Sequence, residues 1–100
     1  MNYNIKKDKA SVTANIGGDL TVNDNVAFIK LLALIFHERS PNYIVDLTAL
    51  DTIDSTGLGM LLMVREKAKA LGSTTELRGA RGMVIQTLRS AKFDTMFSMT

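Results

Sequence analysis

A carboxylate and two hydroxyls stand side by side near the middle of the chain, in the segment Asp54-Ser55-Thr56-Gly57. The residues that follow have helical spacing, so we expect these side chains at the start of a helix that begins near Thr56. The first N–H groups of a helix have no internal acceptor, and the helix dipole favours negative charge beside them. A hydroxyl cap is the simplest role for Ser55 or Thr56, because serine and threonine are preferred there. The same geometry tolerates a phosphate on Ser55, and the two roles are compatible.

Side chains suited to catalysis are sparse. Nucleophilic serine chemistry needs a base beside the nucleophile, and the only histidine is His37, at the end of a predicted helix. Ile53 stands where the hydrolase elbow G-x-S-x-G needs its first glycine. The segment Gly57-Leu58-Gly59 begins like a dinucleotide fingerprint, but Leu62 takes the place of the third glycine and no phosphate-loop lysine follows. The sequence therefore predicts neither an enzyme nor a bound cofactor.

Three carboxylates, those of Asp46, Asp51 and Asp54, are close enough in sequence to gather near one loop. Without histidine or cysteine they would form only a weak oxygen site for a hard cation. A solvated acidic loop explains them better, and we predict no metal site.

The composition describes one folded domain over residues 1–100, because 46% hydrophobic and 22% charged residues suit a single core. Twelve Lys and Arg against ten Asp and Glu are scattered along the chain, which gives little reason to expect nucleic acid as a partner. There is no cysteine, so no oxidising compartment is needed. The longest apolar run, residues 26–36, is broken by Lys30 and too short to span a bilayer. We expect a cytoplasmic location and no membrane insertion.

Alternating and helical spacings predict the order strand, strand, helix, strand, helix, strand, helix, strand. Strands are expected at residues 3–5, 12–16, 43–47 and 74–78, with a small closing strand at 93–97 and with Gly17-Gly18 ending the second strand. Helices are expected at about residues 21–38, 56–71 and 82–91. Helices between strands favour an α/β fold, here a mixed sheet of about four to five strands with helices packed against it.

The first predicted helix is apolar around much of its circumference. One apolar stripe consists of Val26, Ile29, Ala33 and Phe36, which fall at helical spacing. Further apolar side chains come from Phe28, Leu31, Leu32, Leu34 and Ile35. A helix on one side of a sheet needs only one apolar stripe, so the surplus is either an exposed binding patch or apolar area that any small domain leaves exposed.

The segment from Ile44 to Leu62 resembles the signature of the STAS domain family, the anti-sigma factor antagonists of bacterial partner-switching systems. In that signature a strand with Asp-Leu is followed by a short spacer and then by Asp-Ser-Ser/Thr-Gly-Leu-Gly, which leads into an apolar helix. Asp46-Leu47 and the residues 54–59 stand in those places. The likeness covers nearly the whole chain: Ile16–Leu20 is similar to the family's link from strand to first helix, and Gly82–Phe97 resembles its third helix and closing strand.

The resemblance implies a STAS-like fold and a phosphorylation-controlled protein-binding regulator. In that family a partner serine kinase phosphorylates the Ser after the Asp, and a PP2C-type phosphatase reverses it. By position Ser55 matches this phosphoacceptor, with Thr56 as a minor possibility. The unphosphorylated form would bind a serine protein kinase that acts as anti-sigma factor, or another regulatory target, and the free chain would be a monomer. The implied partner-binding residues are Asp19, Asp54, Ser55, Thr56, Gly57 and Leu58.

A constitutive subunit is the alternative function. Here the chain would resemble the STAS-like component attached to a bacterial ABC-type lipid transporter, and the Asp-Ser loop would be only a docking surface. Co-purification with a soluble kinase and phosphatase would indicate the switch, and co-purification with a membrane ATPase would indicate the subunit.

Overall fold

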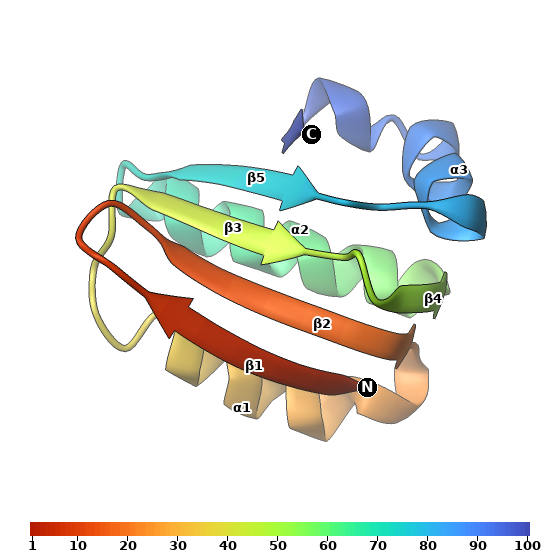
Figure 1. Cartoon of the computed structure of the whole chain (residues 1–100), viewed down its shortest axis with the longest axis horizontal. Helices are drawn as coiled ribbons and strands as arrows, with labels where there is room; N and C mark the ends of the chain where they lie inside the picture. Colours follow the sequence, from red (N-terminus) through yellow and green to blue (C-terminus); the bar gives the residue numbers. More distant parts are fainter.

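The computed structural model, which describes residues 1–100, contains six strands and three α-helices (Figure 1). The strands are β1 (Asn2–Lys7), β2 (Val12–Leu20), β3 (Asn42–Asp46), β4 (Leu50–Ile53), β5 (Thr74–Arg78) and β6 (Ser98–Met99). The helices are α1 (Asn25–Ile35), α2 (Ser55–Ala70) and α3 (Gly82–Ser90), with 3-10 turns at Val22–Asp24 and Phe93–Thr95.

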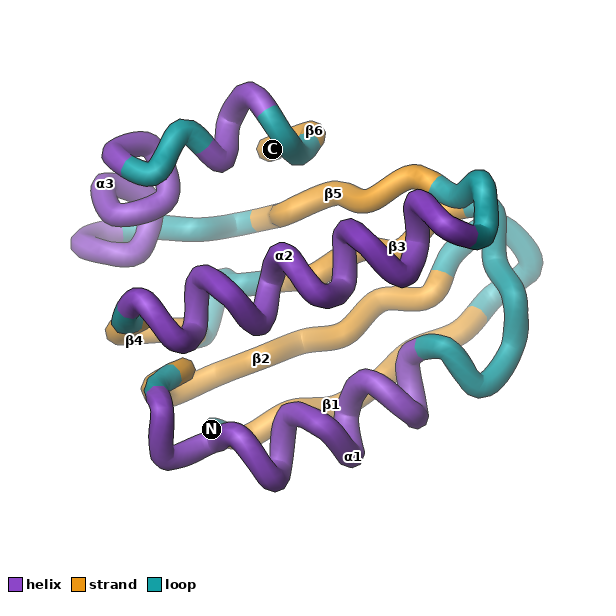
Figure 2. The backbone as a smooth tube through the Cα atoms, turned by 180° about the vertical axis from the view of Figure 1, so that it is seen from behind, coloured by secondary structure: helices purple, strands orange, loops and turns teal.

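The strands form a mixed sheet in the order β1-β2-β3-β5-β6. β1 and β2 are antiparallel neighbours, whereas β2, β3, β5 and β6 run parallel, because helical segments connect them. β4 pairs in parallel with the last residues of β2. The two longest helices, α1 and α2, lie side by side on one face of the sheet, and the opposite face carries no helix (Figure 2). This is the predicted STAS-like α/β architecture.

Strand alternation supplies one side of the core. The inward-facing side chains of β2 and β3 are buried, namely Val12, Ala14 and Ile16 of β2 and Tyr43 and Val45 of β3. The helices complete it with side chains at helical spacing, and the α2 members are Met60, Leu61, Val64 and Ala68. These side chains recur three and four residues apart, as the helical spacing of the sequence after Gly57 predicts.

The first helix buries only one of its two apolar stripes. Its buried side chains are Phe28, Leu31, Leu32 and Ile35. Val26 and Ile29 are 71% and 59% exposed, Ala33 is exposed and Phe36 is half-buried. Both sets have helical spacing, so spacing alone does not choose between them, and packing on the sheet selects the bulkier set. The helix also ends at Ile35 rather than near Glu38.

Two further corrections concern strands. β2 does not end at Gly17-Gly18 but continues to Leu20, because Gly18 adopts a positive φ of 78° and the register shifts there toward β4. β4 lies where the sequence predicted only a loop. At the other end of the chain, residues 93–95 form a 3-10 turn, and the closing strand follows at Ser98–Met99.

Candidate functional site

The start of α2 is capped by a carboxylate and not by a hydroxyl. The helix begins at Ser55, one residue before the predicted start, so the cap position falls to Asp54. Its Oδ1 accepts the backbone N–H of Gly57 at 2.8 Å, and its Oδ2 accepts that of Val22 at 3.1 Å. One side chain therefore closes the start of α2 and ties it to the turn that precedes α1. The predicted hydroxyl cap is wrong.

The hydroxyls of Ser55 and Thr56 therefore do not cap the helix. Ser55 is exposed and Thr56 is half-buried, and neither hydroxyl makes a hydrogen bond within the chain. The N–H of Gly57, one of the first N–H groups of the helix, donates to Asp54. The N–H groups of Ser55 and Thr56 have no intrahelical acceptor. The geometry thus offers an accessible hydroxyl beside two unpaired N–H groups, an arrangement that suits negative charge.

Gly57 is buried beneath this surface and allows a close approach between helix and sheet. A Cβ at this position would collide with the carbonyl oxygen of Leu20 and lie 2.7 Å from Cγ1 of Ile53. Two residues further on, a Cβ at Gly59 would meet nothing within 4 Å. The first glycine of the pair therefore positions the helix start on β2 and β4, while Leu58 between them packs half-buried against the core.

Two further carboxylates come from β2 and β4, which end near the start of α2 (Figure 1). Asp19, on the last part of β2, accepts a hydrogen bond from the hydroxyl of Thr52 on β4 at 2.5 Å. Asp51 pairs with the guanidinium of Arg81 at 3.0 Å, and both side chains are more than half exposed. With Asp54 they make up a carboxylate rim at this end of the molecule, in which Asp51 is paired with Arg81.

Exposed apolar side chains flank the same end of the molecule. Val22, whose N–H binds Asp54, is 58% exposed, and the exposed Val26 follows one helical turn later. Val26 belongs to the stripe of Val26, Ile29, Ala33 and Phe36, and the sequence left open whether surplus apolar side chains of this helix form a binding patch.

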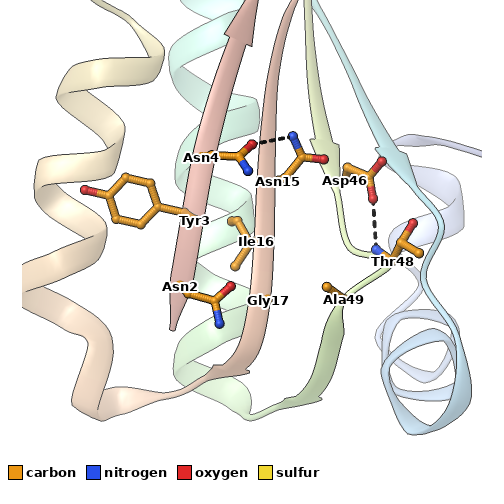
Figure 3. A pocket seen from close by; sticks show the side chains of 9 residues that line it. All are labelled: Asn2, Tyr3, Asn4, Asn15, Ile16, Gly17, Asp46, Thr48 and Ala49. Carbon is orange, nitrogen blue, oxygen red and sulfur yellow. Dashed lines mark hydrogen bonds between the residues drawn. The ribbon is translucent and has the colours of Figure 1, made fainter.

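A separate hollow of about 370 Å³ lies on the helix-free face of the sheet (Figure 3). Its polar side chains are those of Asn2, Asn4, Asn15, Asp46 and Thr48. Asn15 donates to Asn4 at 2.8 Å, and the N–H of Thr48 donates to Asp46 at 2.9 Å (Figure 3). None of the six predicted partner-binding residues lines it.

The other groups considered for chemistry lie apart. His37 is exposed beyond the end of α1. Asp46, Asp51 and Asp54 have different partners, namely the N–H of Thr48, a guanidinium and two backbone N–H groups. The chain contains no cluster of three metal-ligating side chains. It also contains no helix long and apolar enough to cross a membrane.

The structure brings the predicted partner-binding residues together. Asp19, Asp54, Ser55, Thr56, Gly57 and Leu58 lie on the end of β2 and the first turn of α2, which Leu20 joins through its carbonyl hydrogen bond with the Asp54 N–H at 3.3 Å. They form one contiguous surface, apart from the buried Gly57.

Comparison with known proteins gives one family. The family model described as Mlab, STAS domain matches residues 3–99. A putative anti-sigma factor antagonist from Thermotoga maritima has a TM-score of 0.86 at 16% identity, covering 97% of this chain and 84% of that one. The anti-sigma factor antagonist SpoIIAA in its unphosphorylated form has a TM-score of 0.75 at 20% identity, covering 99% and 87%. The phosphorylated form of SpoIIAA from Bacillus has a TM-score of 0.73 at 16% identity, covering 99% and 91%. Comparison with curated proteins finds no match.

Proposed function

The chain belongs to the STAS domain family, and from this premise we propose that it is a protein-binding regulator whose docking surface is switched by phosphorylation of Ser55. The unphosphorylated chain binds a serine kinase that acts as an anti-sigma factor, or another regulatory target, in the cytoplasm. A PP2C-type phosphatase restores the binding form. The chain itself catalyses no reaction.

One observation carries this proposal: Ser55 is an exposed hydroxyl at a helix start that another residue already caps. Because Asp54 satisfies the N–H of Gly57, a modification of Ser55 removes no hydrogen bond from the fold. The free N–H groups of Ser55 and Thr56 favour the added phosphate, which keeps the helix start folded in both states. The fold therefore tolerates both forms of the serine.

The switch acts at the interface. Phosphate adds about −1.5 to −2 charges beside the apolar Val22 and the carboxylate rim. A partner that covers Ser55 would have to desolvate that charge among apolar contacts. A penalty of about 3–4 kcal/mol lowers affinity by roughly several hundredfold, which converts a binder into a non-binder without refolding.

Two substitutions of Ser55 test the proposal. The chain is purified from its native cells with its bound partner, and the affinity of each variant for that partner is measured by calorimetry. We expect Ser55→Ala to bind like the unphosphorylated wild type. Ser55→Asp should bind more weakly, because it carries a negative charge into the interface, while its melting temperature stays at least as high as that of the wild type. Equal affinity of the two variants, or loss of binding only through unfolding, would refute the proposal.

The assignment to Ser55 rather than Thr56 has its own control. The partner kinase should phosphorylate Thr56→Ala like the wild type and leave Ser55→Ala unmodified. The structural reason is accessibility, since Ser55 is exposed and Thr56 is half-buried. The reverse pattern would move the switch to Thr56.

A constitutive subunit of an ABC-type lipid transporter is the second candidate. The Asp54 link between the two helix starts supports it, because it presents the same docking surface without any modification. Co-purification with a membrane ATPase, with Ser55 unmodified, would favour this function.

A further inference from the structure

We propose that the groove between α1 and α2 receives an amphipathic helix of the partner protein, with its apolar stripe on Ile29 and Met63 and an acidic side chain against Lys67. The inference rests on the proposed function, because it identifies the segment of the partner that binds beside Ser55.

The groove contains apolar side chains that the fold itself leaves uncovered. Val26 and Ile29 on α1 and Met63 on α2 are 71%, 59% and 44% exposed. Large exposed apolar side chains that gather in one place mark interaction sites, whereas isolated ones are ordinary. Ile29 and Met63 line the same hollow between these two helices, which run next to each other (Figure 2), and Val26 precedes Ile29 by three residues on α1.

Two hollows make the groove continuous. One of about 320 Å³ is lined by Ile29, Leu32, Ala33, Phe36, Met63 and Lys67. The next, of about 310 Å³, is lined by Phe36, Lys67, Ala70 and Leu71. Phe36 and Lys67 belong to both, so the hollows join along the helix pair.

A helix fits this groove better than an extended segment. The groove is bounded by side-chain ridges of two helices and offers no free strand edge, so side chains spaced three and four apart on a third helix can enter it. α1 has 11 residues, about 16 Å, which matches about three turns of a partner helix.

The charge at the edge of the groove favours an acidic residue on the partner helix. Lys67 is exposed and has no carboxylate partner, and Arg39 lies nearby, where it donates to the carbonyl oxygen of Leu71 at 3.3 Å. No acidic residue lines either hollow. An Asp or Glu on the partner helix therefore finds a cation at this end.

The groove extends toward the start of α2, where Ser55 lies. The hydrogen bond from Val22 N–H to Asp54 joins the start of the α1 segment to the start of α2. Val22, Val26 and Ile29 follow one another four and three residues apart, from that junction into the groove. A partner that contacts Ser55 can thus continue along the groove in one interface.

Site-specific photo-crosslinking in native cells identifies the occupant. Benzoylphenylalanine is placed at position 29 or 63 in the groove, at position 34 as a control, and at position 51 on β4, four residues before Ser55. Leu34 is a matched control because it is on the same helix and exposed, but faces the β1 side with Tyr3 and Ile5. The chain carries Ser55→Ala so that phosphorylation does not interfere.

We expect positions 29 and 63 to crosslink one partner segment with apolar residues three and four apart and an Asp or Glu near one end, and position 34 to crosslink none. Crosslinks at 29 and 63 to a second copy of this chain or to an extended segment would overturn the inference. Crosslinks at 51 alone would overturn it and leave the proposed function standing. The absence of crosslinks at all positions would count against both.

Affinity measurements with the partner so identified sharpen the result. Ile29→Glu should weaken binding by about thirtyfold, since it places a charge in the apolar centre of the interface. Lys67→Glu should weaken it by about tenfold. Leu34→Glu should change it by less than about twofold, with thermal unfolding unchanged in all three variants because the substituted side chains are exposed. Equal effects of Ile29→Glu and Leu34→Glu would overturn the assignment of the groove.

Discussion

The starts of α1 and α2 lie against each other, yet they use their side chains differently. Before α1, Thr21 and Asp24 form a capping box in which the Thr21 N–H donates to Asp24 at 2.8 Å and the Thr21 hydroxyl is engaged as well. Before α2, Asp54 is the cap and the hydroxyls of Ser55 and Thr56 are not used. The difference shows why a hydroxyl at one helix start is structural and a hydroxyl at the other is available for modification.

The largest expected effect concerns the glycine that lets α2 approach the sheet. Gly57→Ala should lower the free energy of unfolding by about 3 kcal/mol, because its Cβ would collide with the Leu20 carbonyl and with Ile53. Gly59→Ala is the matched control: its Cβ has open space, so it should raise stability by about 0.5–1 kcal/mol. Urea unfolding of both variants measures this. Similar effects of the two would mean that the close approach of α2 is not needed.

The next effect separates the two caps. Asp54→Ala removes the acceptor of two backbone N–H groups and should cost about 2 kcal/mol, whereas Thr21→Ala should cost about 1 kcal/mol. Asp54→Asn keeps one carbonyl acceptor, so its free energy of unfolding should lie between those of the wild type and Asp54→Ala. Chemical denaturation of the three variants checks the order, and a neutral Asp54→Ala would contradict the assigned cap.

The pH dependence of stability distinguishes the first helix start. The backbone N–H of Thr21 lowers the pKa of Asp24 from its ordinary value, with the nearby amino group of Met1 adding to the effect. A lowered pKa in the folded state stabilises the fold above the unfolded value of about 3.9, and this stabilisation is lost as the pH falls through the folded value. Asp24→Asn should therefore flatten the fall in unfolding free energy below about pH 4.

The comparison variant for that experiment is Asp8→Asn. The N–H groups of Ala10 and Ser11 also lower the pKa of Asp8, so this variant should flatten the same pH range without touching a helix start. If the unfolding free energy of Asp24→Asn fell with decreasing pH in parallel with that of the wild type, the role of Asp24 in the capping box would be contradicted.

The smallest effect is the one that the switch requires. Ser55→Ala should change the free energy of unfolding by less than about 0.5 kcal/mol, because the hydroxyl is exposed and makes no hydrogen bond in the fold. Thermal unfolding of Ser55→Ala, measured together with that of Thr21→Ala, tests this directly. A loss as large as that of Thr21→Ala would mean that Ser55 has a structural role like that of Thr21.

The sequence predicted the parts of this site that depend on strong local patterns. The start of α2 was placed within one residue, because its buried residues recur at helical spacing, and the Asp-Ser segment identified the STAS domain resemblance. β4 was missed because it has only four residues, two of them exposed, and it forms through its partner β2 rather than by its own alternation. The cap was misassigned because a shift of one residue moves that position from Ser55 to Asp54. The exposed patch on the first helix was predicted only as one of two alternatives, because α1 carries two apolar stripes and only packing on the sheet decides which one is buried.

Site-resolved mass spectrometry of the chain purified from its native cells tests the central claim most directly. Cleavage at Arg39 and Arg65 gives a peptide of residues 40–65, which contains Ser55 together with Ser40, Thr48, Thr52 and Thr56, so fragmentation must locate the phosphate. We predict one phosphate on Ser55, retained in Thr56→Ala and absent in Ser55→Ala, with partner co-purifying only with the unphosphorylated chain. A peptide that is unmodified under every growth condition, or a phosphorylated Ser55 chain that still carries its partner, would contradict the account.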